Sequence, residues 1–148
     1  MRLYHGAGGL FENVDFHRAV LNWLNIRGAT FRDVSLRGVF ALETDFAGAR
    51  FERCGFFCAN LNRANFTDAV LDDCFLVGAL MNGADPRGAK LSNCDLNGIR
   101  GGATPDTPVL IKLAGSIYDE KTEWPGDFDP EPFGAINGTK RIWQGPPG

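Results

Sequence analysis

The residues best suited to chemistry in this sequence are two histidines and four cysteines. Three cysteines, Cys54, Cys74 and Cys94, follow one another at twenty-residue spacing. A column of thiolates could bind a metal, but three stacked thiols lack the fourth ligand and the tetrahedral spread that zinc requires. We therefore interpret these three core cysteines as small residues of a packed interior. His5 and His17 have no Ser, Cys or second His at a matching spacing, so we interpret them as solvated surface residues.

The twenty-residue spacing is part of a repeat of five residues. Stepping by five from Phe11 to Leu96, sixteen of eighteen positions are large and apolar, and the exceptions are Ala41 and Pro86. The position two residues earlier is small, apart from Leu24. An α-helix would rotate this stripe by about 140° at each step, and a flat strand would send successive large residues to opposite faces. The remaining structure is a β-solenoid, whose chain turns a corner every five residues.

Columns at twenty-residue spacing indicate four sides to each coil. Glu12, Arg32 and Glu52 alternate in charge, as a ladder between coils would. Glycine occupies seven of the eighteen positions two residues after the large one, which predicts corners with positive φ. We expect distortion at Ala41, which lacks the large side chain, and at Pro86, which cannot donate a ladder hydrogen bond.

Residues 59–63, 64–68 and 69–73 resemble the A(D/N)LXX signature of the pentapeptide-repeat family, and the resemblance covers residues 9–100. It implies an all-β fold, a right-handed quadrilateral β-helix of about 4 to 5 coils. It also makes one column the polar position of the family, where we expect hydrogen bonds that support the ladder and no ion site. That column contains Asn25, Asp45, Asn65 and Asp85.

The repeat predicts three segments: a lead-in over residues 1–8, the β-helix over 9–100, and a linker with a capping extension over 101–148. The extension carries a YDEKTxWPxxFDP pattern that resembles the C-terminal extension of small cyanobacterial pentapeptide-repeat proteins. The last coil of a solenoid exposes an apolar cross-section and unpaired strand groups. We expect Tyr118, Trp124 and Phe128 to cover it.

Composition narrows the functional class. The chain has 15 basic and 18 acidic residues, a net charge of -3, which argues against direct nucleic-acid binding. No segment resembles a signal peptide or a membrane span, and the cysteines lack the spacing of a disulfide scaffold, so we expect a cytoplasmic protein without membrane contact. Inward Phe and Leu columns leave no pocket for a substrate. We therefore expect no enzyme and no cofactor.

A rigid solenoid offers flat surfaces for binding. The leading interpretation is a non-enzymatic scaffold or regulator that acts through protein–protein interaction with an unidentified partner; by resemblance, small cyanobacterial members include such regulators. The alternative is a DNA mimic that binds gyrase, the quinolone-resistance type of this family. Mimicry needs an acidic face, whereas residues 1–100 carry 11 basic and 11 acidic residues. A third class, an enzyme, would need an activity in the tail.

Eight apolar side chains are predicted to point outward on two adjacent sides: Val20, Trp23, Phe40, Leu42, Phe57, Phe75, Val77 and Leu80. One column of this set is interrupted only by Asn60. Together the eight would form a contiguous apolar patch of the kind that marks an interface. Three occupants stay open: the tail segment 109–113, a second copy in a homodimer, or a foreign protein.

Overall fold

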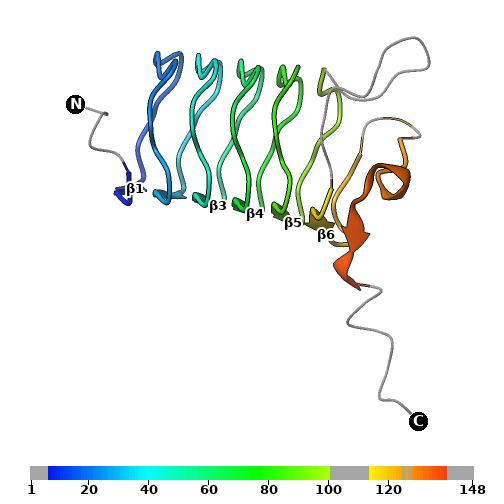
Figure 1. Cartoon of the computed structure of the whole chain (residues 1–148). Helices are drawn as coiled ribbons and strands as arrows, with labels where there is room; N and C mark the ends of the chain where they lie inside the picture. The colour runs from blue at the N-terminus through cyan, green and yellow to red at the C-terminus, as the bar shows by residue number, and fades with distance from the viewer. Residues whose placement is uncertain (1–6, 101–113, 125, 127, 140–148) are drawn as a thin grey trace.

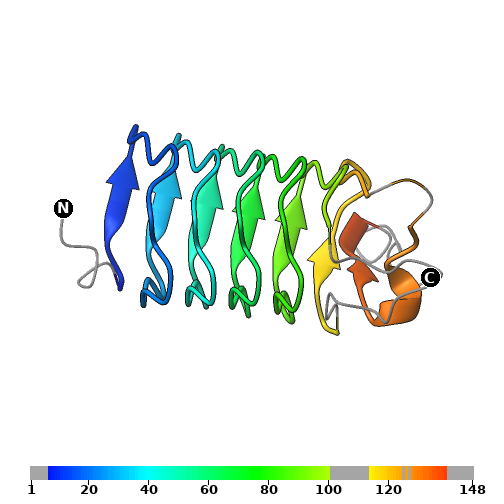
Figure 2. The same ribbon diagram turned by 90° about the horizontal axis from the view of Figure 1, so that it is seen from above.

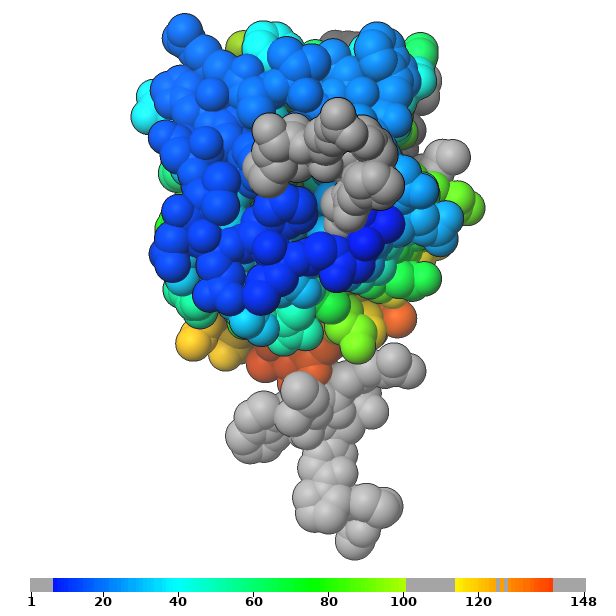
Figure 3. Space-filling model, turned by 90° about the vertical axis from the view of Figure 1, so that its left-hand side faces the viewer, coloured from blue at the N-terminus to red at the C-terminus, as the bar shows by residue number. Residues whose placement is uncertain are grey.

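The computed structural model of the protein describes residues 7–100, 114–124, 126 and 128–139. Within these residues the chain winds into a rod of stacked coils, seen from the side in Figure 1 and from above in Figure 2. Figure 3 looks at the N-terminal end of the rod. The all-β solenoid is confirmed. The predicted linker and its segment 109–113 lie outside the described residues.

One side of the rod is a parallel sheet with one strand from each coil. Its strands are β1 (Leu10–Glu12), β2 (Thr30–Arg32), β3 (Arg50–Glu52), β4 (Val70–Asp72), β5 (Lys90–Ser92), β6 (Ile117–Tyr118) and β7 (Ile136–Asn137). The seven strands lie side by side in chain order. From β1 to β5 the paired residues are twenty apart, as in Phe31 with Phe51. This register confirms a coil of twenty residues.

The other three sides are held by single bridges between coils. Asp15 pairs with Ser35 on the second side, Val20 with Phe40 on the third, and Asn25 with Asp45 on the fourth. Between sides the chain turns through one residue in the left-handed region. The eighteen corners from Asn13 to Gly98 have φ between 49° and 73°, at seven glycines and at eleven other residues. The glycine pattern therefore located the corners but marked fewer than half of them.

The backbone at the corners is hydrogen-bonded to the neighbouring coil. This explains why residues other than glycine can adopt a left-handed φ there. The corner N–H of Arg18 donates to the carbonyl of Arg37 at 3.0 Å, and the same bond recurs along the rod. A left-handed φ costs a non-glycine residue roughly 1 to 3 kcal/mol when nothing supports it. Here most corners donate such a hydrogen bond to a carbonyl of the next coil, which offsets part of this cost.

Aromatic side chains fill the bore. Phe31 stacks on Phe51 with ring centroids 4.8 Å apart, and Phe46 stacks on Phe66 at 5.1 Å. The small residue of each repeat is buried beside them; Ala49 has no exposed surface. Side chains therefore fill the interior along its axis.

The expected distortion at Ala41 and Pro86 is wrong. Ala41 is fully buried, and its N–H donates to the carbonyl of Asn60 at 2.8 Å. The hydrogen bonds between coils are kept at Ala41 because backbone groups make them, so they do not depend on the size of the side chain. Pro86 is buried and accepts a hydrogen bond from Ser116 Oγ at 3.0 Å, and Ala89 donates to the same carbonyl.

The side chains of the polar column close turns within their own coil. In each case Oδ1 accepts a hydrogen bond from the backbone N–H two residues later in the same coil. The pairs are Asn25 with Arg27, Asp45 with Ala47, Asn65 with Thr67 and Asp85 with Arg87. The expected ladder bonds are thus replaced by Asx turns, which a short side chain forms with its own corner.

The parallel sheet continues past residue 100. Strand β6 pairs with β5 in the register Leu91 to Tyr118, and β7 pairs with β6. On the second side Asp95 bridges Glu123. The seven rungs exceed the predicted 4 to 5 coils, because the tail adds strands to the solenoid as well as lying over its end.

Candidate interaction surface

Two exposed aromatic rings meet on the second side of the rod. Phe57 and Phe75 are 37% and 48% exposed, and their rings stack with centroids 5.6 Å apart and planes 16° apart. Gly55 makes this possible, because a Cβ there would lie 3.2 Å from the Phe57 ring. Val77 follows Phe57 in the same corner column and is half-buried. The structure therefore brings these three predicted residues together.

A shallow depression lies beside this stacked pair, with Ser35 and Gly55 among its lining residues. Arg53 borders it and donates to Asp33 through Nε at 2.8 Å, which holds the pKa of that carboxyl below its ordinary value. Arg37 borders it too and makes no ion pair with any described residue. The sequence analysis did not identify Arg37 and Gly55 as part of this surface, because each contributes to it only through its neighbours in adjacent coils.

The third side carries the other part of the predicted patch. Val20 and Phe40 bridge each other and are 68% and 46% exposed. Leu80 lies two coils beyond Phe40, across Asn60, and is half-buried like Leu42. The predicted column is thus present, and its most exposed members lie toward the N-terminal end.

Trp23 occupies a left-handed corner with φ of 60° and is 66% exposed. Its indole Nε1 donates to Glu43 Oε2 at 3.1 Å. Glu43 also accepts from Arg63 at 3.1 Å. The carboxylate therefore orients the ring at the edge of the third side. Leu10, which is 58% exposed on the first side, lies outside the predicted surface.

The three residues expected at the C-terminal end form an aromatic cluster. Tyr118 meets Trp124 edge to face at 5.4 Å, and Trp124 lies 5.7 Å from Phe128. Trp124 and Phe128 pack against the core. Burial, together with the hydrogen bond from Tyr118 to Glu131 at 3.1 Å, raises the pKa of Tyr118 to about 12.

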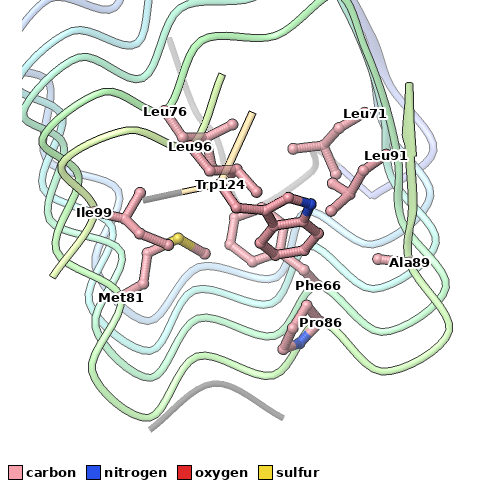
Figure 4. Close-up of a pocket in the computed structure, with 10 residues that line it drawn as sticks. All are labelled: Phe66, Leu71, Leu76, Met81, Pro86, Ala89, Leu91, Leu96, Ile99 and Trp124. Atoms are coloured by element: carbon pink, nitrogen blue, oxygen red, sulfur yellow. The ribbon is translucent and has the colours of Figure 1, made fainter. Parts of the chain in front are cut away.

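Trp124 also borders a small apolar cavity of about 30 Å³ at the end of the bore, shown in Figure 4. Its lining includes Phe66, Leu91 and Leu96. The indole Nε1 of Trp124 is buried and has no hydrogen-bond partner among the described residues. The cavity is no larger than a single water or methyl group needs.

Comparison with known proteins agrees with this geometry. Residues 59–98 match the model of pentapeptide repeats, in eight copies. The chain carries pentapeptide repeats. No curated protein matches it by sequence.

Among solved structures, this pentapeptide-repeat protein is similar to a pentapeptide repeat protein, Rfr23, from the cyanobacterium Cyanothece 51142. That similarity has a TM-score of 0.64 at 17% identity and covers 80% of this chain and 88% of that one. A pentapeptide repeat protein from Nostoc Pcc 7120 matches with a TM-score of 0.33 at 23% identity, covering 83% and 84% of the two chains. The plasmid-mediated fluoroquinolone resistance protein QnrB1 matches with 0.34 at 15%, covering 90% and 97%. The first similarity shows a shared fold.

The core cysteines of this pentapeptide-repeat protein lie inside the bore. Cys54 and Cys94 each donate Sγ–H to a backbone carbonyl at 3.3 Å. Contact with these two thiols, and burial, raise the pKa of the Cys74 thiol. Cys58 is exposed at a corner, and His17 is exposed on the first coil. Among the described residues no helix has the length and apolar character to cross a membrane.

Proposed function

We propose that this pentapeptide-repeat protein is a non-enzymatic scaffold or regulator that acts through protein–protein interaction. The observation that carries the proposal is the set of exposed aromatic side chains, Phe40, Phe57 and Phe75, on adjacent sides of a rigid rod. Aromatic side chains bury much area and lose little conformational entropy on binding, so they dominate interface energetics. The eight-residue patch is accordingly the proposed interaction surface.

The packed bore supports binding rather than catalysis. The stacked rings of Phe31, Phe51 and their neighbours fill the axis, so the rod offers flat sides to a partner. A substrate pocket normally encloses roughly 300 to 1,000 Å³. The cavity beside Trp124, about 30 Å³, is far smaller, and the depression beside Phe57 and Phe75 is shallow and open to solvent.

The charge pattern argues against the alternative, a DNA mimic that binds gyrase. A mimic needs a continuous acidic face, but here acidic and basic side chains alternate between coils. Arg32 bonds Glu52 at 2.8 Å, Arg53 bonds Asp33 at 2.8 Å, and Arg63 bonds Glu43 at 3.1 Å. Each pair neutralises a carboxylate that mimicry would require.

The proposal is tested with Phe40→Glu in the full chain. Affinity purification from the native organism, with mass spectrometry, compares the wild type, Phe40→Glu and a control, Lys90→Glu, placed on the first side. Loss of specific partners in Phe40→Glu alone, with an unchanged melting temperature, supports the proposal. A large loss of stability would instead assign the third side to the tail. Partners unaffected by Phe40→Glu and by Phe75→Glu would refute the surface.

A further inference from the structure

The C-terminal half of the second side is acidic, and its carboxylates have no cationic partner. A hollow beside Phe75 is lined by three carboxylates and one amine, those of Asp73, Asp95, Glu123 and Lys121. None of these four side chains makes an ion pair with a described residue. Arg53 attracts Asp73 from the preceding coil, but it is already paired with Asp33. The hollow therefore keeps an excess of negative charge.

Two of these carboxylates repel each other. Asp95 and Glu123 are bridge partners on adjacent coils, so their side chains leave the same column one strand spacing apart, about 4.8 Å. Asn97 Nδ2 donates to both, at 2.9 Å to Asp95 and at 2.7 Å to Glu123. A neutral amide satisfies oxygen lone pairs but leaves two like charges directly opposite each other, which destabilises a sheet. A cation at this position would be stabilising.

An exposed aromatic ring borders the same hollow. Phe75 has 48% of its surface exposed, and Val77 lies half-buried two residues further along the same coil. Basic side chains also bind favourably over aromatic faces. The surface therefore fits a ligand that carries basic residues next to aromatic or aliphatic ones.

The chain itself carries such a segment immediately after the last described residue. Residues 140–143 read Lys-Arg-Ile-Trp, two basic residues followed by two apolar ones, and residues 140–148 contain no acidic residue. Residues 114–139, in contrast, contain six acidic residues and one basic residue. The charge of the segment is thus opposite to that of the part of the chain from which it starts.

The described part of the chain ends close to this surface. Thr139 Oγ1 accepts a hydrogen bond from the N–H of Glu120 at 3.1 Å, and Glu120 lies between β6 and the second-side residue Glu123. Strand β7 lies three strand spacings beyond β4, whose coil carries Phe75, a distance of about 14 Å. Four extended residues span up to about 14 Å, so Trp143 can reach this ring.

We propose that residues 140–143 dock on the C-terminal half of the second side of their own chain. The two basic residues lie at Glu123 and Asp95 in this arrangement, and Trp143 lies against Phe75. Docking covers the second-side part of the interaction surface and leaves the third side open, so the segment regulates access of a foreign partner. The inference rests on the proposed function for that consequence alone, because docking itself requires no partner.

The neighbouring groove on the first side is a poorer match for the segment. It is lined by Thr139, Asp72 and Asp119, but Lys90 lies among them, which leaves one net negative charge against two on the second side. Asp119 already accepts three hydrogen bonds. The aromatic residue in its lining, Tyr118, is buried.

The test is fluorine NMR of the full chain labelled with 5-fluorotryptophan. The chain has three tryptophans, and Trp143→Phe assigns the signal of Trp143. The isolated peptide of residues 140–148 gives the position of an undocked ring. In the folded wild type the signal should lie away from that position. Dilution from about 500 to 10 µM should not move it, because a short linker holds the segment at millimolar effective concentration.

Charge reversal tests the proposed contacts. Glu123→Arg should move the Trp143 signal more than half of the way to the peptide position, because it places like charges together. Arg141→Glu should do the same without altering the rod. The double variant should move back toward the wild-type position, since the charges are then opposite again. Glu12→Arg, which reverses an exposed carboxylate on the first coil, is the matched control and should leave the signal unchanged.

Circular dichroism melts show whether each variant is folded. If Glu123→Arg melts early, Glu123→Gln replaces it and should give a smaller shift in the same direction. A wild-type signal at the peptide position overturns the inference, as does a signal insensitive to Arg141→Glu or a double variant that stays at the peptide position. A signal that moves on dilution shows docking on a second copy and overturns it too.

The proposed function can fail separately. If Trp143 is docked but Phe40→Glu and Phe75→Glu lose no partner, docking stands and the proposed interaction surface is wrong. If Phe75→Glu loses a partner while Trp143 is undocked in the wild type, the proposed function stands and this inference is wrong.

Discussion

Phe51 is the residue whose truncation best tests the packing of the bore. It has no exposed surface and lies at mid-rod on β3. Its ring stacks on Phe31 at 4.8 Å, and it meets Phe46 and Phe56 edge to face at 5.5 and 5.1 Å. A fourth ring, Phe66, lies 6.0 Å away. Phe51→Ala therefore removes one large side chain and four aromatic contacts, in a column where backbone ladders above and below resist collapse.

Truncation of a buried phenylalanine costs about 3 to 5 kcal/mol. Each aromatic pair adds about 0.5 to 1.5 kcal/mol beyond its buried area. We therefore expect Phe51→Ala to lower the free energy of unfolding by about 5 kcal/mol, the upper end of the range for a buried phenylalanine. Phe51→Leu should cost much less, because Leu71 fills the same column in the next coil.

Urea unfolding followed by far-ultraviolet circular dichroism measures this loss. Phe40→Ala is the matched control, since Phe40 is 46% exposed and its truncation should cost less than about 1 kcal/mol. The unfolding slope should stay the same in both variants, which keeps the comparison on stability alone. A loss below about 1 kcal/mol for Phe51→Ala would refute the packed bore.

The other predictions concern the end of the rod, the thiols, the charge ladder and the alternative function. Trp124→Ala, or deletion from residue 104 onward, should lower the melting temperature and promote association, measured by calorimetry and light scattering; an unchanged monomer would refute the cap. One thiol of four, Cys58, should react rapidly with a disulfide reagent, and the core cysteines only on unfolding; rapid reaction of more than one thiol in the folded chain would contradict their burial. Hydrogen bonds from Arg50 and Arg32 lower the pKa of Glu52, so its stabilisation is present above its ordinary value of 4.5 and lost as the pH falls. Glu52→Gln should consequently flatten the acid limb of the stability–pH curve, and an identical limb would show that the ladder contributes nothing. Stoichiometric protein should not restore gyrase supercoiling in the presence of a quinolone; measurable rescue would favour the DNA mimic.

The sequence by itself determined the repeat, the twenty-residue coil and the inward columns. Each inward position meets the same position of the next coil, as Phe31 meets Phe51, so the core selects residue size again at every repeat. The residue types at a fixed spacing are therefore enough to predict the fold. The predicted outward columns follow from the same arithmetic, which is why Val20 and Phe40 lie in one column.

The contacts between outward-facing side chains could not be predicted from the spacing of the repeat. Phe57 covers Gly55 and stacks on Phe75. Its rotamer depends on the space that the side chains of the adjacent coils leave free. Arg53 pairs with Asp33 across coils for the same reason. Spacing places such residues near one another but does not select their rotamers.

Only the tertiary structure decided the end of the rod. The step from β5 to β6 is 27 residues, from Lys90 to Ile117, so the tail enters the ladder without the period that revealed the earlier coils. Its register is set by backbone groups left open on the last coil, such as the carbonyl of Ala89, which accepts from the N–H of Ile117 at 2.8 Å. Backbone hydrogen bonds carry no signature in residue type, so a strand that joins by them alone is invisible to the pattern.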